Sequence, residues 1–302
     1  MSNAHAVQSR TIVANGQTFH VLSAGDPSAP LVLCLHGFPE FSGAWSEVLP
    51  QLAGTYYAVA PDQRGYGLSS KPEGTEPYRV QHLAKDMLAL ADEIAPGRPI
   101  HLVAHDWGAS VAYMMAFMAP QRISKLIVLN GVHPVLFQRA LINDPEQAAA
   151  SQYIHFLRRD DAARLLLENN GRRLLDFLER GFGAGRWLTD AKRTGYLNAW
   201  QQPRAVEAMV NWYKATPLVI PKPGETIAAD PLAHIPPGTV RVKMPHLLLW
   251  GVEDKALRPS CIEGLDAYCD SLSVRTIAGA DHWIVHQQTD HIVREIKAFL
   301  AA

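Results

Sequence analysis

The sequence predicts an α/β protein in which a mostly parallel, doubly wound sheet is interrupted by a long all-helical insertion. Up to about residue 134, short apolar runs alternate with helical patterns, as in parallel sheets covered by helices on both faces. From about Ala140 to Ala215 the patterns are helical, with Arg-rich polar faces and no strand signal. The apolar run Met244–Gly251 then restores the sheet.

These shifts divide the chain into a first core segment (1–134), a helical cap with its connector (135–240) and a second core segment (241–302). A chain of 302 residues is long enough for one large α/β domain with an inserted lid. The formal net charge of −1 gives no reason to expect nucleic acid or an acidic membrane as a partner. No apolar run approaches the roughly 18 residues of a membrane-spanning helix.

The N-terminal decapeptide M-S-N-A-H-A-V-Q-S-R has no apolar core, so we expect no secretory signal there. The three cysteines, Cys34, Cys261 and Cys269, cannot all pair, and their spacing is not that of a zinc site. We therefore expect reduced thiols and a cytoplasmic location. The sequence also allows a homodimer.

The expected elements follow the chain in order. An Asn15-Gly16 turn joins two alternating runs within Ser9–Ala24, which is typical of a β-hairpin. Strands and helices are then expected at Leu31–Leu35 (strand), Phe41–Leu52 (helix), Tyr56–Pro61 (strand), Leu83–Ile94 (helix), Ile100–Ala104 (strand), Ala109–Met118 (helix) and Lys125–Asn130 (strand). After Met244–Gly251 we expect a helix, a strand at Ser273–Ile277 and a closing helix from about Asp290.

The junction between strand Ile100–Ala104 and the following helix carries the main candidate for chemistry. There Asp106 is the middle residue of a small-x-Asp-x-small pattern, in which the small residues are Ala104 and Gly108. This pattern is typical of a sharp strand-to-helix turn, whose middle residue is strained and lifted above the sheet edge. Asp106 is therefore a candidate nucleophile. The alternative is a simple helix N-cap, in which the carboxylate only accepts backbone hydrogen bonds.

Two further candidates follow later strands. Asp254 comes just after the strand that ends near Trp250, and His282 comes just after the last expected strand. Because parallel strands end at one edge of the sheet, we expect Asp106, Asp254 and His282 to lie together. Their order along the chain is nucleophile, acid, base, in which the histidine acts as base and the acid orients it.

Other polar residues near these strand ends are weaker candidates. Asn130 ends its strand, but an amide cannot replace the acid, so Asp254 keeps that role. Ser110 lies one helical turn beyond Asp106, where its hydroxyl should face the helix, and we set it aside as a nucleophile. The histidines show no spacing typical of a metal site, so no metal and no cofactor is expected.

Five motifs are spread along the chain: H-G-F-P-E at 36–40, D-x-R-G-Y-G-x-S at 62–69, A-H-D-W-G at 104–108, W-G-x-x-D at 250–254 and D-H-W at 281–283. Together they resemble the α/β-hydrolase epoxide hydrolases, whose close relatives include haloalkane and fluoroacetate dehalogenases. The resemblance covers nearly the whole chain. It implies an α/β-hydrolase fold with a sheet of the eight-stranded type, an all-helical cap and a small apolar epoxide or halogenated substrate.

The resemblance also implies a mechanism. Asp106 would attack an electrophilic carbon and form an alkyl ester, and His282, oriented by Asp254, would activate the water that hydrolyses it. The backbone N–H groups of Phe38 and Trp107 would form the oxyanion hole. An aspartate nucleophile requires a strained or good leaving group on carbon, which argues against esters and amides as substrates.

Epoxide hydrolases donate a proton to the epoxide oxygen from the lid, usually from two tyrosines. Here Asn211-Trp212-Tyr213-Lys214 resembles the second tyrosine motif and indicates Tyr213 as a donor. The resemblance places His155 at the position of the first lid tyrosine, and Tyr153, two residues away, is the other candidate. We expect the substrate pocket to include His36, Trp107, Tyr153, Phe156 and Trp283.

A haloalkane or haloacid dehalogenase with the same Asp-His-Asp triad is the alternative. Trp107 matches the halide-binding tryptophan of haloalkane dehalogenases, but Phe38 stands where an asparagine donor would be needed. Fluoroacetate dehalogenases place arginines where this chain has Trp107 and Ser110, so a carboxylate-bearing haloacid is disfavoured. The combination of Phe38 and Tyr213 favours an epoxide over a halogenated compound as the substrate.

Overall fold

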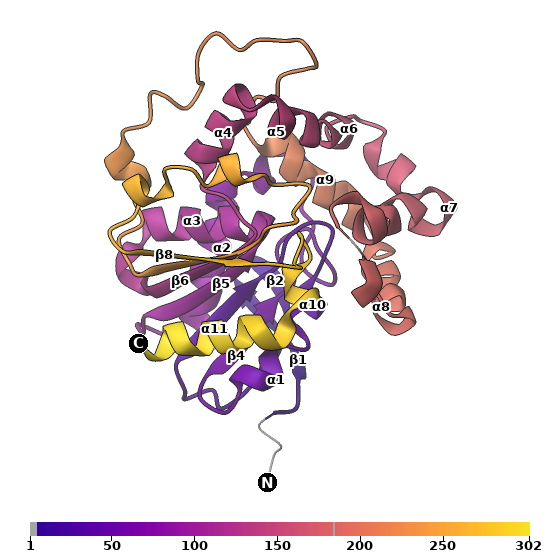
Figure 1. The fold of residues 1–302 in the computed structure, drawn as a ribbon. Helices are drawn as coiled ribbons and strands as arrows, with labels where there is room; N and C mark the ends of the chain where they lie inside the picture. The colour runs from indigo at the N-terminus through magenta and orange to yellow at the C-terminus, as the bar shows by residue number, and fades with distance from the viewer. Residues whose placement is uncertain (1–4, 184) are drawn as a thin grey trace.

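The computed structural model describes residues 5–183 and 185–302 (Figure 1). Part of the N-terminal decapeptide, residues 1–4, lies outside this range. The strands are β1 (Gln8–Ala14), β2 (Gln17–Ala24), β3 (Leu31–Leu35), β4 (Tyr57–Pro61), β5 (Ile100–His105), β6 (Ile123–Leu129), β7 (His246–Gly251) and β8 (Leu272–Ile277). They form one eight-stranded sheet in the order β1-β2-β4-β3-β5-β6-β7-β8.

The sheet is mostly parallel, which confirms the predicted fold class. β1 and β2 form the expected antiparallel hairpin, and β2 also runs antiparallel to β4. The other neighbouring strands are parallel to each other. Strands β3 and β4 are fully buried, as expected for continuous apolar runs in a sheet covered on both faces.

Helices cover both faces of the sheet (Figure 1). α2 (Val80–Ile94) and α3 (Trp107–Met118) pack on one face, and α1 (Leu49–Leu52), α10 (Ile284–Gln287) and α11 (Thr289–Ala301) pack on the other. Side chains of β5 alternate between the two cores: Leu102 and Ala104 join the first, and Val103 joins the second. Because β5 is buried from both sides, it is a rigid base for the turn that follows it.

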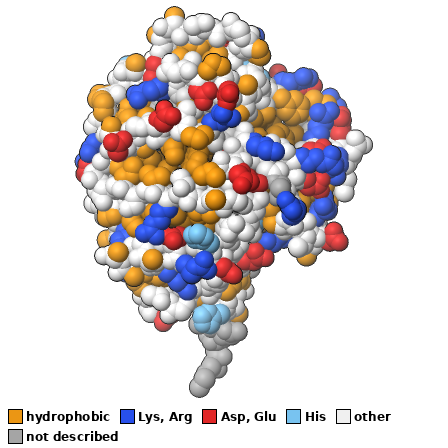
Figure 2. All heavy atoms as spheres, in the orientation of Figure 1, with side chains coloured by type: hydrophobic (Ala, Val, Ile, Leu, Met, Phe, Trp, Pro, Cys, Tyr) orange, Lys and Arg blue, Asp and Glu red, His pale blue; other side chains and the backbone are white. Residues whose placement is uncertain are grey.

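The chain between β6 and β7 is largely helical, and we refer to it as the cap. Its helices are α4 (Pro134–Asn143), α5 (Pro145–Ala150), α6 (Tyr153–Leu157), α7 (Ala162–Asp176), α8 (Asp190–Trp200) and α9 (Ala205–Ala215). Figure 2 shows charged side chains gathered on the side of the molecule where α7 and α8 lie, and ion pairs such as Arg164–Glu168 and Arg172–Glu179 connect some of them. The exact division of the chain at residues 134 and 240 stays a prediction.

The strand order reverses between β3 and β5, and this reversal positions the site. From β3 the chain moves outward to β4, returns to β5 on the other side, and continues outward to β6. The loops that follow two such strands diverge over opposite faces and leave a crevice where ligands bind in open α/β sheets. Here the crevice lies between the loop after β3, which carries Phe38, and the turn after β5, which carries Asp106.

Asp106 is held in a strained conformation in this turn. Its φ is +50° and its ψ is −123°, a region that non-glycine residues rarely adopt. The small neighbours are required because a Cβ on Gly108 would lie 2.3 Å from the carbonyl oxygen of Leu35. The side chain of Asp106 makes no capping hydrogen bond to α3, so the N-cap alternative is wrong.

Two predicted helices are wrong. Instead of one helix over Phe41–Leu52, a 3-10 turn at Ser42–Trp45 precedes α1, and Pro50 lies in the first turn of α1. Proline has no N–H and clashes with the preceding turn, so it starts this helix and cannot continue an earlier one. Before β8, two 3-10 turns replace the expected helix, separated by Gly264 at a φ of +78°.

Two helices begin earlier than expected: α3 at Trp107, directly after Asp106, and α4 at Pro134. Within the described residues, no helix is long and apolar enough to span a membrane.

The close packing at the turn makes a testable prediction about stability. Gly108→Ala should lower the free energy of unfolding, by up to about 2 kcal/mol. The gain in helix propensity is about 1 kcal/mol, whereas overpacking against backbone that cannot move costs about 1–3 kcal/mol. Urea unfolding would measure the difference. Gly238→Ala is the control, because a Cβ there would meet nothing within 4 Å; equal losses in both variants would contradict the prediction.

Candidate active site

The structure brings Asp106, Asp254 and His282 together at the carboxyl edge of the sheet. They follow β5, β7 and β8 respectively. The Nδ1 atom of His282 lies 2.9 Å from Oδ2 of Asp254, and its Nε2 atom lies 3.6 Å from Oδ2 of Asp106. The imidazole therefore stands between two carboxylates, oriented by one and facing the other, in the arrangement of a nucleophile–base–acid triad.

Asp254 is fixed by hydrogen bonds on both oxygens. Its Oδ1 accepts from the backbone N–H groups of Ala256 (2.7 Å) and Leu257 (2.9 Å), and its Oδ2 accepts from the side-chain amide of Asn130 (2.7 Å). The Oδ1 of Asn130 in turn accepts from the N–H of Gly251 (2.8 Å). Asn130, excluded as the acid itself, therefore holds the acid in place, a role that the sequence analysis missed.

The nucleophile candidate already contacts one expected oxyanion-hole donor. The N–H of Phe38 donates to Oδ1 of Asp106 at 2.7 Å. Trp107 is the first residue of α3, and the free N–H groups at a helix N-terminus stabilise negative charge. Oδ1 of Asp106 thus occupies the place where an oxyanion would be stabilised, and Oδ2 is left facing His282.

Two tyrosines of the cap, the buried Tyr213 and the half-buried Tyr153, lie across from Asp106. Tyr213 of α9 and Tyr153 of α6 line the same small cavity as Asp106, and their ring centroids are 6.1 Å apart. Burial raises the pKa of both phenols, so both keep their protons and can donate them. His155 is not among the residues that line this cavity, and its assignment as the first lid donor stays a prediction beside Tyr153.

Comparisons with known proteins agree with this geometry. The family model described as "alpha/beta hydrolase fold" matches residues 30–289. The chain belongs to this family. It is 32% identical to the AB hydrolase superfamily protein YfhM of Bacillus subtilis, covering 93% of this chain and 94% of that protein. It is also 32% identical to Epoxide hydrolase 4 of Mus musculus, covering 95% of this chain and 77% of that protein.

Solved structures of epoxide hydrolases have the same fold. One, described as a novel epoxide hydrolase from metagenomes of hot environments, has a TM-score of 0.87 and 30% identity, covering 98% of this chain and 99% of that chain. An epoxide hydrolase of Bacillus megaterium in complex with an inhibitor has a TM-score of 0.83 and 27% identity, covering 97% and 100% of the two chains. The resemblance predicted from the five motifs is confirmed.

The cavity at Asp106 in this α/β hydrolase is small, about 40 Å³. Trp107 and Tyr153 line it as expected, but three other residues predicted for the pocket are not among its lining. His36 is buried beneath the loop, where its Nε2 accepts from the N–H of Gln63 at 3.2 Å. Trp283 packs behind His282 at 5.0 Å between ring centroids, and Phe156 lies under the guanidinium of Arg173. The assignment of these three residues to the substrate pocket therefore stays a prediction.

The charge state of His282 follows from its neighbours. Burial alone would lower its pKa, but the charge and hydrogen bond of Asp254 and the charge of Asp106 outweigh burial and raise the pKa to about 9. At neutral pH the resting imidazole is therefore a cation between two carboxylates. Any reaction that neutralises Asp106 removes one of these charges and lowers the pKa of His282, so that the imidazole more readily takes the neutral form that can accept a proton.

A second buried network lies behind the triad. Glu40 accepts hydrogen bonds from the hydroxyl of Tyr196 (2.6 Å) and lies 2.6 Å from Nε2 of His286 and 3.2 Å from Nδ1 of His105. Burial would raise the pKa of Glu40, but the charge of His286 and the hydrogen bonds of both histidines hold it well below its ordinary value.

His105 connects this network to the triad, because its Nε2 lies 2.8 Å from the carbonyl oxygen of His282. Glu40 ends the motif H-G-F-P-E, but nothing local to the sequence identifies its partners, which come from β5, α8 and α10. Among the described residues, no group of three His, Cys, Asp or Glu side chains could hold a metal ion.

The charges around His282 lead to a second prediction. Asp106→Asn should lower the pKa of His282 from about 9 toward its ordinary value of 6.5, because a negative charge 3.6 Å away is lost. NMR titration of the imidazole would measure the change. Asp160→Asn, which removes an exposed carboxylate of the cap, is the control for net charge. An unchanged pKa in the Asp106 variant would contradict the assigned cause.

Proposed function

We propose that this α/β hydrolase converts epoxides into vicinal diols through a covalent alkyl ester on Asp106. The observation that carries this proposal is the placement of a strained carboxylate opposite two phenols, those of Tyr153 and Tyr213, across a small cavity. A carboxylate nucleophile and an acid for the departing oxygen are the two groups that epoxide opening requires. The epoxide hydrolases among the relatives support the same chemistry.

In the first step, Oδ2 of Asp106 attacks a ring carbon, because Oδ1 is already held by the N–H of Phe38. A carbon–oxygen bond of the ring breaks, and the oxygen takes a proton from Tyr213 or Tyr153. Asp106 becomes a neutral ester. The pKa of His282 then falls, and its proton returns to the tyrosinate, which leaves a neutral imidazole.

In the second step, His282 takes a proton from water while the water oxygen attacks the carbonyl carbon of the Asp106 ester. The oxyanion forms on Oδ1 beside the N–H groups of Phe38 and Trp107. When the intermediate collapses, the bond between the carbonyl carbon and the alkyl oxygen breaks and the diol leaves with the acid proton. Asp106 is again a carboxylate and His282 again a cation, so the net reaction is epoxide plus water to diol.

The third prediction tests this ester. His282→Ala should still be alkylated but should not release the product, because the base for the second step is missing. Intact mass spectrometry after incubation with a panel of epoxides and haloalkanes should show a gain equal to a whole epoxide. Asp106→Asn, which lacks the nucleophile, should show no gain.

The same experiment distinguishes the alternatives. A gain equal to an alkyl group minus hydrogen, with halide released and no epoxide adduct, would replace the proposal by a dehalogenase. Full turnover in His282→Ala would contradict the role given to the histidine. No adduct from any compound would contradict Asp106 as the nucleophile.

The fourth prediction concerns the lid. Tyr213→Phe and Tyr153→Phe should each keep the ring but remove the proton donor, and loss of a general acid typically costs about 10²-fold or more in kcat/KM. His155→Gln should lose less than either, because His155 does not line the cavity. Steady-state kinetics with one epoxide measures all three. A larger loss for His155→Gln than for Tyr153→Phe would restore the histidine as the donor.

We also propose a cytoplasmic location, supported by the cysteines Cys34, Cys261 and Cys269, which are all free and buried. Reduced thiols suit a reducing compartment. The homodimer stays a prediction.

A further inference from the structure

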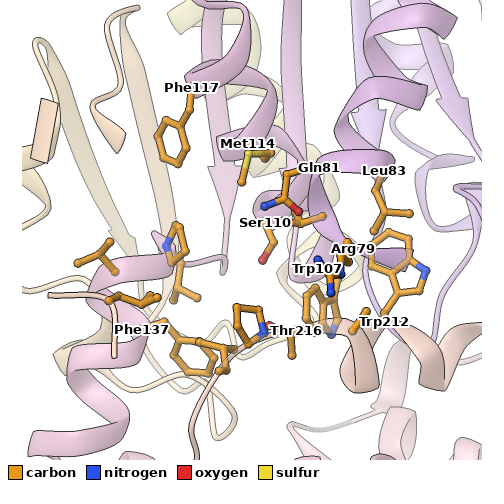
Figure 3. A pocket seen from close by; sticks show the side chains of 18 of the residues that line it. Arg79, Gln81, Leu83, Trp107, Ser110, Met114, Phe117, Phe137, Trp212 and Thr216 are labelled. Carbon is orange, nitrogen blue, oxygen red and sulfur yellow. The ribbon is translucent and has the colours of Figure 1, made fainter. Parts of the chain in front are cut away.

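A large cavity, which we call the side chamber, lies next to the small cavity at Asp106 (Figure 3). Its volume is about 480 Å³. One wall is formed by α3, from which Trp107, Ser110, Met114 and Phe117 face the chamber, and the opposite side is formed by the cap and by the connector that follows α9.

The side chamber adjoins the cavity at Asp106. The two cavities share five lining residues, Trp107, Ser110, Val132, Phe137 and Leu218. Trp107 directly follows the nucleophile, and Ser110 lies one helical turn further along α3. The small hydroxymethyl group of Ser110, set aside as a nucleophile, thus lies at the boundary between the reacting centre and the chamber.

The volumes of the two cavities fit a substrate that has a small reacting group and one large substituent. A cavity needs about 10–15 Å³ to hold one water, so the 40 Å³ at Asp106 holds roughly three waters or an epoxide ring with little attached. A dry cavity of about 150 Å³ binds benzene. The side chamber, at 480 Å³, therefore has room for a group considerably larger than one phenyl ring.

The walls of the chamber indicate an apolar tail. Aromatic side chains contribute on several sides, among them Phe117 of α3, Phe137 of α4 and Trp212 of α9. Arg79 and Gln81 are exposed residues among the lining, and they mark its polar rim. Concave sites with mainly apolar walls and a few polar groups are typical of small-molecule binding.

We propose that the substrate is a monosubstituted epoxide whose single large apolar group, aryl or long alkyl, occupies the side chamber while the ring lies at Asp106. This inference rests on the proposed function and adds the class of substrate. A second large substituent on the ring would have to fit the space around Asp106, which is too small for it. Burial of apolar carbon in the chamber supplies the binding energy that holds the ring in place.

A series of 1,2-epoxyalkanes, from epoxypropane to epoxydodecane, tests the proposal. Each CH₂ that enters the chamber should raise kcat/KM by up to about fourfold, until the chamber is full. Met114→Trp fills part of the chamber and should lower the ratio of kcat/KM for epoxydecane to that for epoxypropane by at least tenfold. Met118→Trp, one turn later on α3 at an exposed site outside the lining, is the matched control and should leave the ratio unchanged.

Two further variants keep the test independent of one substitution. Leu232→Trp narrows the chamber from the connector and should lower the same ratio, whereas Phe117→Ala enlarges the chamber and should move the optimum to longer chains. A ratio that responds equally to Met114→Trp and Met118→Trp, or a kcat/KM independent of chain length, would overturn the proposal while leaving epoxide hydrolysis intact.

A binding measurement separates this proposal from the proposed function. The binding of decane-1,2-diol, which cannot react, is measured by isothermal titration calorimetry, and Met114→Trp should weaken this binding at least tenfold relative to Met118→Trp. If the diol binds in this way but no epoxide alkylates His282→Ala, the result supports the chamber as a binding site for an apolar group and contradicts the proposed function. If epoxides alkylate that variant but the diol binds equally well to both tryptophan variants, the chamber proposal fails.

Discussion

The close approach of two backbone segments at the reversal of the strand order is the constraint on which the site depends. The loop after β3 and the turn after β5 are so near that a Cβ on Gly37 would lie 2.2 Å from Oδ1 of Asp106. The same approach places the N–H of Phe38 at 2.7 Å from that oxygen. The positive φ of Asp106 is sustained by the packing around it, so strain, nucleophile and oxyanion donor form one unit. None of the three can change without the others.

Electrostatics around His282 couple this unit to the reaction. Three carboxylates contribute to its raised pKa: Asp254, Asp106 and Glu40. Asp254 is fixed by hydrogen bonds and Glu40 is enclosed between histidines and a tyrosine, and the proposed reaction forms no bond to either carboxylate. Asp106 is the carboxylate that loses its charge in the proposed reaction. The basicity of the imidazole therefore changes when the ester forms, and no conformational change is needed to time the second step.

The ends of the strands could be predicted from the sequence, because each apolar run stops at a definite residue. Asp106, Asp254 and His282 each follow such a run, and parallel strands end at the same edge of the sheet, so the triad could be predicted as well. The sequence could not predict which way a side chain points when that side chain lies on a short helix or loop. Helix α6 has five residues, too few for a hydrophobic period to distinguish Tyr153 from His155. His36 and Trp283 belong to motifs at the site, but motif membership does not say which side of the backbone faces the cavity. The Glu40 network joins four segments far apart in sequence.

The placement of the lid donors depends in turn on how the cap is attached to the core. The indole N–H groups of Trp200 and Trp212 donate to the carbonyl oxygens of Pro39 (2.6 Å) and Arg64 (3.0 Å), and Tyr196 donates to Glu40 (2.6 Å). All three acceptors lie in loops beside the reacting centre, and all three donors are buried. Because Trp212 directly precedes Tyr213 on α9, the bond that ties the cap to the core also sets the height of the phenol above Asp106. The cap is therefore a positioned part of the active site, and its attachment through buried donors explains how a proton donor from an inserted segment can face a nucleophile on the sheet.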